Sequence, residues 1–366
     1  MTKAKICYVS PLSIHSYRWI EAFSRKGYDL SLITDSSYWV APKPQSIPVY
    51  ALPWLMKRNF FRYFIPNTLK ISRILKKINP DIVHLHVQHW YSPVIILGGF
   101  QFMLTSWGDE VLLLKRINIL ETGLAKITAT KACMVTVDAE CMKERWREMG
   151  IPETKVKVIP FGVDIDIFNP TVDAHALRKE LQIGANDIVV ISTRALYNNH
   201  YNVECLIKAI PLILKSHKDV KFIIKGTGPL EAYLKSLVEK LNVSENVRFF
   251  GLVPYNEVAR YLAASNIYVA TSFIDSTSVS LLEAMACGVP PIATDIPGNR
   301  EWIKNGVNGL LYTPKDHLQL AETIVRLIEN EPLRKRFGER CSEIIKRKAT
   351  WEKCVAEMDN IYKSLL

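Results

Sequence analysis

The densest group of residues that could carry chemistry lies between Asp275 and Glu283, in the run Asp-Ser-Thr-Ser-Val-Ser-Leu-Leu-Glu. Thr277 or Ser278 is a natural N-cap for a following helix, and the free N–H groups of a helix N-terminus favour an anion such as phosphate. Glu283 falls about one and a half turns into that helix, where its carboxylate could accept two hydrogen bonds from a vicinal diol such as ribose. Asp275 on the loop could accept from another sugar hydroxyl. A helix cap with a solvent-facing Glu283 would explain the same residues.

The elements that position this group are alternating strands and helices. Short apolar, β-branched runs alternate with longer segments of helical period, which favours parallel sheets joined by crossover helices. We expect strands at residues 5–10, 30–34, 47–50, 82–86, 100–105, 133–137 and 156–159 in the first half, and at 188–193, 221–225, 247–250, 267–270 and 291–294 in the second. Such sheets bind ligands at the carboxyl ends of their strands, so a functional site is expected there.

A break separates the two series of strands. The run Pro160-Phe-Gly-Val-Asp-Ile-Asp-Ile-Phe-Asn-Pro170 is dense in Gly, Pro and Asp, as inter-domain segments are. We therefore expect an α/β protein of two doubly wound, Rossmann-like domains with a ligand cleft between them. Asp164 and Asp166 match a D-x-D metal motif by spacing alone, but they lie in this hinge, and no metal is predicted.

Ordered matches along nearly the whole chain resemble the retaining GT-B glycosyltransferases of family four, the glycosyl transferase group 1 class. The segment from Asp275 to Glu283 resembles the family's E-x7-E block, with Asp in place of the first Glu. Further matches are Val158-Ile-Pro-Phe-Gly162-Val-Asp164, Lys225-Gly226-Thr-Gly228-Pro229, Phe249-Phe-Gly251-Leu-Val253, Pro297-Gly298-Asn-Arg-Glu301 with Asn308-Gly309, and a last helix with Trp351 and Tyr362. The resemblance implies a GT-B fold, with an acceptor-side domain at residues 1–163 plus a crossover helix at about 347–366, and a donor domain at 164–346.

The resemblance also implies a donor site in the second domain that holds a nucleotide-sugar. Arg194 matches the arginine that grips the diphosphate, Glu283 the carboxylate that binds ribose, and Asp275 the group that contacts the transferred sugar. The other implied donor-binding residues are Gly228, Gly251, Leu252, Thr277, Ser278 and Val279. A surface ion pair at a strand end would be the plainer explanation of Arg194. Since Arg194 and helix N–H groups would stabilise the leaving diphosphate, no metal or other cofactor is expected.

The lysine that usually follows the family arginine is absent. In the run Arg194-Ala-Leu-Tyr-Asn-Asn-His200-Tyr201 the lysine place falls at Tyr201, with His200 beside it, so these two residues are the candidate substitutes. Either Arg194 suffices in a variant loop, which is the interpretation we favour, or catalysis is weakened.

The acceptor-side motifs differ as well. The glycine pair that commonly follows the first strand is replaced by a run that contains His15, and Trp107 stands in the place of a family histidine. The acceptor-side candidates are His15, Ser16, Arg18 and Trp107, and the further catalytic candidates are His86 and Asp109. His15 is equally well a helix-start residue without a ligand, Trp107 is either a stacking platform for a sugar or core, and a strand-end histidine such as His86 is more often structural.

The net charge of +11 is concentrated in the first half, because residues 1–163 carry 22 basic and 12 acidic side chains and residues 164–366 carry 25 and 24. Residues 54–77 combine basic with aromatic side chains and contain no acidic one. This segment could bind an anionic membrane surface, or its rings could be core and its lysines a solvated face. A nucleic-acid partner is not expected, because no recognition module is present. Scattered cysteines and a strand at the N-terminus predict a cytoplasmic protein, peripheral at the inner face of the plasma membrane if this segment binds there.

Taken together, the resemblance implies a metal-independent retaining glycosyltransferase of cell-surface polysaccharide synthesis. It would transfer a sugar from a nucleotide-diphosphate donor, UDP-sugar being favoured over GDP-sugar, to a hydroxyl of a glycan, a lipid-linked sugar or a small molecule. Two alternatives remain: a GT-B-fold sugar-nucleotide epimerase or phosphorylase, and a non-catalytic scaffold in a glycan-assembly complex.

Overall fold

The computed structural model describes residues 3–36, 41–53, 60–87, 92–112, 119–197 and 199–366. The chain divides into two compact units, one of Met1–Pro160 with Cys354–Leu366 and one of Phe161–Lys353, and each is described by itself. The expected boundary at residues 163/164 lies three residues beyond the observed one, since Val163 pairs with Thr350 inside the second unit. The first unit includes the last helix from Cys354 onward. The expected start of this crossover segment was at about residue 347.

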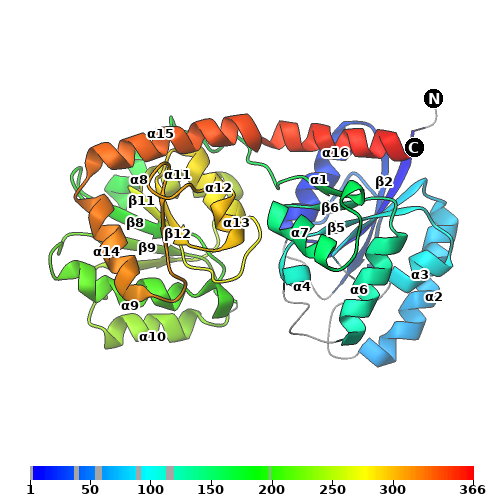
Figure 1. Cartoon of the computed structure of the whole chain (residues 1–366), viewed down its shortest axis with the longest axis horizontal. Coiled ribbons are helices and arrows are strands. Elements are labelled where there is room, and N and C mark those ends of the chain that lie inside the picture. Colours follow the sequence, from blue (N-terminus) through cyan, green and yellow to red (C-terminus); the bar gives the residue numbers. More distant parts are fainter. Residues whose placement is uncertain (1–2, 37–40, 54–59, 88–91, 113–118, 198) are drawn as a thin grey trace. The chain divides into compact units, whose positions relative to one another are not determined.

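A seven-stranded parallel sheet in the order β3-β2-β1-β4-β5-β6-β7 forms the centre of the first unit (Figure 1). Its strands are β1 (Lys5–Val9), β2 (Asp29–Asp35), β3 (Val49–Leu52), β4 (Ile82–His86), β5 (Phe102–Ser106), β6 (Val135–Val137) and β7 (Val156–Val158). Every residue of β4 and β5 is buried, because helices cover both faces of a parallel sheet. The strands expected from the sequence are all present, with bounds shifted by up to two residues.

The helices of the first unit connect these strands and cover the sheet. They are α1 (Ile14–Arg25), α2 (Phe60–Ile78), α3 (Ser92–Leu97), α4 (Asp109–Leu112), α6 (Ile119–Lys131), α7 (Glu140–Glu148) and a 3-10 turn, η1 (Glu153–Lys155). The last helix, α16 (Trp351–Leu365), joins them although it is distant in sequence (Figure 1). Its Tyr362 hydroxyl lies 2.8 Å from the Tyr8 hydroxyl of β1 and 2.5 Å from His84 Nδ1 of β4.

The second unit contains a six-stranded parallel sheet in the order β10-β9-β8-β11-β12-β13. Its strands are β8 (Val189–Ser192), β9 (Lys221–Lys225), β10 (Val247–Phe250), β11 (Ile267–Ala270), β12 (Pro291–Thr294) and β13 (Leu310–Tyr312). The edge strand β13 was not among the expected strands. It is only three residues long, too short for a recognisable apolar run, and it pairs with β12 alone.

Helices cover both faces of this second sheet. They are α8 (His175–Glu180), α9 (Val203–Leu214), α10 (Glu231–Lys240), α11 (Tyr255–Ala263), α12 (Val279–Ala286), α13 (Pro297–Arg300), α14 (His317–Ile328) and α15 (Glu331–Lys348), with a 3-10 turn, η2 (Asn199–Tyr201). Phe222 and Ile224 of β9 pack in one core with α9, α10 and α14, whereas Ile223 packs in the other with α11 and α12. The alternation along β9 therefore assigns each of its side chains to a face.

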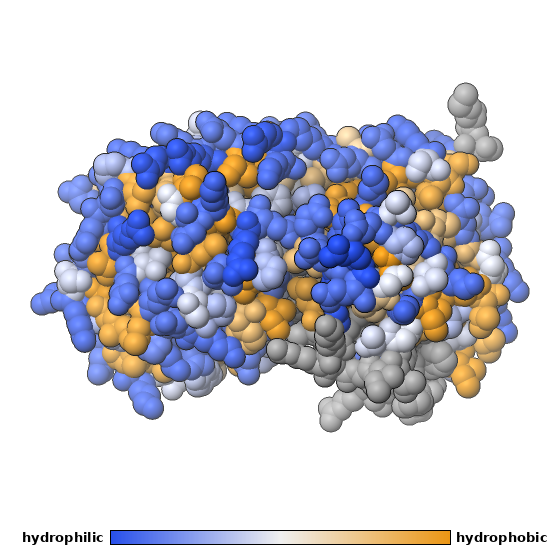
Figure 2. All heavy atoms as spheres, in the orientation of Figure 1, coloured by the Kyte–Doolittle hydropathy of each residue, from blue (hydrophilic) through white to orange (hydrophobic). Residues whose placement is uncertain are grey.

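The helix α15 has one buried, apolar side and one exposed side. Phe337, Cys341 and Ile345 are fully buried on its inner side, whereas Figure 2 shows that the outer side of this helix is mostly hydrophilic. Among the described residues, no helix is both long enough and apolar enough to span a membrane.

Candidate active site

The loop between β11 and α12 is held in one conformation by side-chain hydrogen bonds. Ser278 caps α12 by accepting from the Leu281 N–H at 3.3 Å. Thr294 Oγ1 donates to the Ser272 carbonyl, and Trp302 Nε1 donates to Thr277 Oγ1 at 3.4 Å. A rigid loop at the carboxyl edge of the sheet is what a preformed anion site at a helix N-terminus requires.

Glu283 lies inside α12 and is buried, with 7% of its surface exposed. The alternative of a solvent-facing Glu283 is therefore wrong. Burying a carboxylate in an apolar helix is unfavourable unless charged or hydrogen-bonding groups surround it, so this position indicates a role beyond helix formation.

Arg194, directly after β8, is the centre of the site and is 8% exposed. Its Nη1 donates to Ser278 Oγ at 2.5 Å and to Ser280 Oγ at 3.3 Å. Its Nη2 donates to Ser272 Oγ at 2.9 Å and to Asp275 Oδ2 at 2.5 Å. Since each terminal nitrogen of a guanidinium carries two hydrogens, protein side chains occupy all four. The alternative of an exposed surface ion pair is wrong, because this ion pair is buried.

The charge of Arg194 is balanced within this cluster. Burial opposes the charged form, but Asp275, Tyr268 and Tyr201 more than offset it and hold the pKa of Arg194 above its usual value. The structure thus brings together three residues that the sequence predicted for one site: Arg194, Asp275 and Ser278.

The two candidate lysine substitutes lie beside Arg194 and bring no permanent positive charge. The guanidinium carbon of Arg194 is 4.4 Å from the centre of the Tyr201 ring, and the His200 ring packs edge-on against Tyr201 at 4.5 Å. The backbone carbonyl of Tyr201 accepts from Thr271 Oγ1 at 2.6 Å, and that of His200 accepts from the Phe273 N–H at 3.0 Å. Tyr201 therefore stacks on Arg194 through a cation–π contact.

The glycine turn after β9 lies against the segment that follows Arg194. A Cβ at Gly226 would overlap the Arg194 carbonyl, and one at Gly228 would overlap the backbone of Leu196. Gly251 follows the neighbouring strand β10. A Cβ added at Gly251 would lie 3.5 Å from Thr227 Cγ2. Leu252 beside it is 77% exposed. Because β8, β9 and β10 are parallel neighbours, these predicted donor-binding residues share one edge of the sheet with Arg194.

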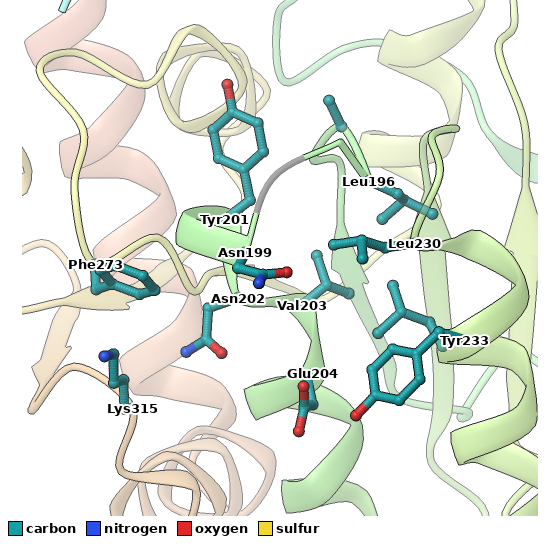
Figure 3. A pocket seen from close by; sticks show the side chains of 12 residues that line it. Leu196, Asn199, Tyr201, Asn202, Val203, Glu204, Leu230, Tyr233, Phe273 and Lys315 are labelled. Carbon is teal, nitrogen blue, oxygen red and sulfur yellow. The ribbon is translucent and has the colours of Figure 1, made fainter. Parts of the chain in front are cut away.

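A cavity of about 420 Å³ is lined in part by Ala195 and Leu196, the residues that follow Arg194 (Figure 3). Tyr201 and Asn202 line it from the α9 side, Tyr233 lines it from α10, and Phe273 with Lys315 forms the opposite wall. Lys315 Nζ lies 4.4 Å from the centre of the Phe273 ring. Glu283 is not among the residues that line this cavity.

In the first unit, three predicted residues form an aromatic cluster. His86 Nδ1 lies 3.0 Å from Ser10 Oγ, and its ring is 4.9 Å from that of Trp107. The Trp107 ring is in turn 5.8 Å from that of His15. Burial, followed by the nearby Arg18, lowers the pKa of His15 to about 4. The imidazole of His15 is therefore neutral near pH 7.

The expectation that Ser16 faces an acceptor is wrong. Its hydroxyl is completely buried, donates to the Pro11 carbonyl at 2.6 Å and accepts from the Ser13 N–H at 3.0 Å, so it belongs to the capping box of α1. Asp109 is the first residue of α4, but its side chain lies outside the described ones.

The basic and aromatic segment is described only in part. Residues 54–59 and the side chains of residues 60–64 lie outside the described part of the chain. In the rest of α2, Ile65 and Leu69 are 67% and 52% exposed. The exposed basic residues of this helix are Lys70, Arg73, Lys76 and Lys77.

Lys225 was not predicted from the sequence as a site residue. It is the last residue of β9, is 7% exposed and interacts electrostatically with Glu283. A lysine that ends an apolar strand immediately before a glycine turn was the available signal.

Comparisons with known proteins agree with this arrangement. The family described as "Glycosyltransferase Family 4" matches residues 12–167, and "Glycosyl transferases group 1" matches residues 173–343. The chain is 26% identical over 303 residues to N-acetyl-alpha-D-glucosaminyl L-malate synthase of Bacillus anthracis, covering 81% of this chain and 78% of the relative. It is 25% identical over 361 residues to UDP-Gal:alpha-D-GlcNAc-diphosphoundecaprenol alpha-1,3-galactosyltransferase of Escherichia coli, covering 91% and 90%.

A solved structure supports the fold. The Anabaena protein HepE, in complex with UDP-glucose, matches with a TM-score of 0.83 at 19% identity, over 98% of this chain and 99% of that one. The two parallel-sheet units are accordingly the two Rossmann-like domains of a GT-B fold, as predicted from the sequence. The chain therefore belongs to the group 1 glycosyltransferases, and it is a glycosyltransferase with the GT-B fold.

Proposed function

We propose that this glycosyltransferase transfers a sugar from a nucleotide-diphosphate donor to a hydroxyl group with retention of configuration. The observation that carries the proposal is the buried cluster of Arg194, Asp275 and the capped N-terminus of α12, with Glu283 buried in the same helix. It provides the groups that a sugar nucleotide needs: N–H donors for phosphate, a carboxylate for a diol and a second carboxylate for the sugar.

Each of these groups has a separate task in the proposed reaction. The free N–H groups of Val279 and its neighbours at the N-terminus of α12 stabilise negative charge on the leaving diphosphate. Glu283 accepts hydrogen bonds from the ribose hydroxyls. Asp275, fixed by Arg194 at 2.5 Å, orients the transferred sugar. In a front-face reaction of this type the acceptor hydroxyl attacks from the side of the leaving group, so no second carboxylate on the opposite face is required.

We favour a UDP-sugar as donor and a glycan, lipid-linked sugar or small molecule as acceptor, in cell-surface glycan synthesis. The support comes from the names of similar proteins: HepE is solved with UDP-glucose, and the Escherichia coli relative uses UDP-Gal and a diphosphoundecaprenol-linked sugar. A GDP-sugar is the alternative, since a Corynebacterium glutamicum relative is named a GDP-mannose-dependent mannosyltransferase. We propose that the same transfer runs without a metal ion, because Arg194 and the N–H groups at the N-terminus of α12 would stabilise the leaving diphosphate.

A donor panel tests this function. Purified protein is incubated with UDP-, GDP- and ADP-sugars, and binding is read by thermal shift, because a ligand of the folded state raises Tm by mass action. The donor that binds is then tested with acceptors, with and without EDTA, and the anomeric configuration of the product is read by NMR. We expect stabilisation by one donor class, an α-configured product from an α-configured donor and no loss of rate with EDTA.

Other outcomes would contradict particular parts of the proposal. Donor consumption that requires orthophosphate would indicate a phosphorylase, and conversion of the donor without an acceptor an epimerase. Binding of a sugar nucleotide without turnover across the acceptor panel would indicate a scaffold. Binding of none of the sugar nucleotides would overturn the proposed function as a whole.

We further propose that the protein acts at the inner, anionic face of the plasma membrane. The exposed apolar pair Ile65 and Leu69 of α2 lies beside the exposed cations of the same helix, which is the arrangement of an interfacial amphipathic helix. A lipid-linked acceptor would be reached from that surface.

A further inference from the structure

Lys225 is a buried cation at the edge of the sheet where the donor would bind. It is the last residue of β9 and is 7% exposed. Along β9, Phe222 and Ile224 pack with α9 and α10, whereas Ile223 packs with α12. Side chains alternate along a strand, so Lys225 lies on the α12 face. Its electrostatic interaction with Glu283, in α12, agrees with this placement.

The strand end that carries Lys225 lies next to Arg194. Ser192 of β8 is the register partner of Ile224 of β9, so the two strands end side by side. The following residue, Gly226, approaches the Arg194 carbonyl so closely that any side chain would overlap it. Arg194 and Lys225 therefore lie at the ends of adjacent strands of one sheet.

The charged group that the structure shows beside Lys225 is the carboxylate of Glu283. Burial lowers the pKa of Lys225, and the carboxylate of Glu283 opposes that shift. Buried charges in proteins are normally paired, because an unpaired one is costly. A lysine that is 7% exposed at a ligand-binding edge, beside the carboxylate of Glu283, is therefore placed to bind an anionic group of a ligand as well.

The rest of the site needs such a cation. Arg194 is paired with Asp275 at 2.5 Å, so the two charges balance. Tyr201, at the place where a lysine was expected, stacks on Arg194 as a neutral ring. A nucleoside diphosphate brings at least two negative charges, and helix N–H groups carry only partial positive charge.

We propose that Lys225 binds the diphosphate of the donor and supplies the positive charge that Tyr201 does not. Because Glu283 is its neighbour, Lys225 contacts the phosphate adjacent to the ribose. Glu283 and Lys225 thus recognise the ribose and that phosphate from one face of the sheet. This inference rests on the proposed function and adds a binding residue to it.

The test compares Lys225→Met, Lys225→Arg and a matched control, Lys221→Met, at the opposite end of the same strand. Isothermal titration gives the affinities of the full chain for UDP, GDP or ADP, whichever the wild type binds, and for the corresponding nucleoside. We expect Lys225→Met to weaken nucleoside diphosphate binding about tenfold to a hundredfold, as loss of a hydrogen bond to a charged group does. Nucleoside binding should stay within about twofold, Lys225→Arg should retain part of the diphosphate affinity, and Lys221→Met should change neither.

The outcomes separate three explanations. If Lys225→Met binds the diphosphate as tightly as wild type, the inference is wrong while the proposed function stands. An equal loss of affinity for the nucleoside and the nucleoside diphosphate would show that Lys225 acts only through Glu283 at the ribose. That result would also overturn the inference. If wild type binds no nucleoside diphosphate, the proposed function fails and this inference fails with it. Nucleoside binding at the wild-type level, together with a cooperative thermal unfolding transition of Lys225→Met, excludes misfolding as the cause of lost diphosphate affinity.

Discussion

At the scale of single residues, the Arg194–Asp275 pair both shapes the site and contributes to stability. Arg194 joins three serines and one carboxylate from the β11–α12 loop and α12 to the end of β8. The Asp275 side chain is only 16% exposed. Removing the arginine would therefore leave a mostly buried carboxylate without its counter-charge, which is the costly way to break an ion pair.

We expect Arg194→Met to lower the free energy of unfolding by about 2–4 kcal/mol, below the upper range for fully buried pairs because Asp275 is partly solvated. Turnover should be lost as well, since the loop that orients the sugar is no longer fixed. Chemical denaturation measures the first effect. The double variant Arg194→Met/Asp275→Asn removes the isolated charge and should recover part of the stability but no activity. An Arg194→Met protein as stable as wild type would show that the pair does not hold the loop.

The sequence placed Arg194, Asp275 and Ser278 in one donor site, because Asp275 and Ser278 lie in the block that resembles E-x7-E and Arg194 matches the family arginine after a strand. It missed Lys225, because an isolated lysine at a strand end has no local signature of burial, and only the packing of α12 against β9 creates it. Ser16 was assigned to the acceptor for the opposite reason: a serine near a helix start is compatible with a ligand and with a cap, and the structure shows the cap.

At the scale of elements, the contact of α12 with α15 sets the position of α12, the helix of the candidate site. Gly338 in the interior of α15 lies against Gly288, the residue that ends α12 in a left-handed conformation (φ 72°). A Cβ at Gly338 would overlap the Gly288 carbonyl, so the two backbones touch. This close approach fixes the far end of the helix whose N-terminus forms the site.

We expect Gly338→Ala to destabilise the second unit by about 1–3 kcal/mol, because backbone atoms have to move to accept the methyl group. The matched control is Gly123→Ala, in the interior of α6, where a Cβ meets no atom within 4 Å. That substitution should stabilise the protein by up to about 1 kcal/mol through helix propensity. Scanning calorimetry compares the two. Stabilisation by Gly338→Ala would mean that α12 and α15 are not in backbone contact.

The attachment of α16 to the first sheet depends on a neutral histidine. His84 Nδ1 lies 2.5 Å from the Tyr362 hydroxyl of α16, and His84 Nε2 lies 2.6 Å from Thr105 Oγ1 of β5. Burial lowers the pKa of His84 from its usual 6.5 to about 3. The other titratable groups against it are His86, on the same strand, and Tyr8, whose pKa burial raises, so Tyr8 stays neutral in the acid range.

Stability should therefore fall as the pH drops below about 6.5, because the unfolded chain binds a proton at His84 that the folded protein excludes until about pH 3. The slope from one such group reaches at most about 1.4 kcal/mol per pH unit. Denaturation at several pH values between 7 and 4 measures it, and His84→Gln, whose amide keeps hydrogen-bonding capacity, should flatten the profile. The exposed His175→Gln is the control and should leave it unchanged. Identical profiles for wild type and His84→Gln would refute a buried neutral His84.

The order and type of the elements could be predicted because strands buried on both faces read as apolar runs between helical segments. The residues at which the helices and strands begin and end could not be predicted in this way. The helix α1 begins at Ile14 because Ser13 and Ser16 form a capping box there. The strand β13 depends on pairing with β12, a long-range contact with no counterpart in a three-residue run.

At the scale of the whole molecule, the excess positive charge and the candidate site lie in different units. Residues 164–366, which contain the Arg194 cluster, carry 25 basic and 24 acidic side chains. The excess lies in residues 1–163, and α2 contributes four exposed cations beside two exposed apolar side chains. We therefore propose that the charge serves the acceptor or the surface that presents it. The amino-acid composition indicated the excess of basic side chains. That several of these side chains are exposed on one helix, α2, follows only from the fold.

We expect the protein to float with liposomes that contain anionic lipid and not with neutral ones, and to be released by salt, since surface attraction is screened. Each basic residue near an anionic surface contributes about 1 kcal/mol, so reversing three of them should abolish binding. The variant is Lys70→Glu/Arg73→Glu/Lys77→Glu on α2. The control, Arg336→Glu/Lys346→Glu/Arg347→Glu on α15, makes the same change in net charge on another exposed helix. Equal loss in both variants would indicate attraction by overall charge, and retention by the α2 variant would place the membrane contact elsewhere. Only selective loss in the α2 variant agrees with docking through this helix, because then the position of the cations, and not their number, decides binding.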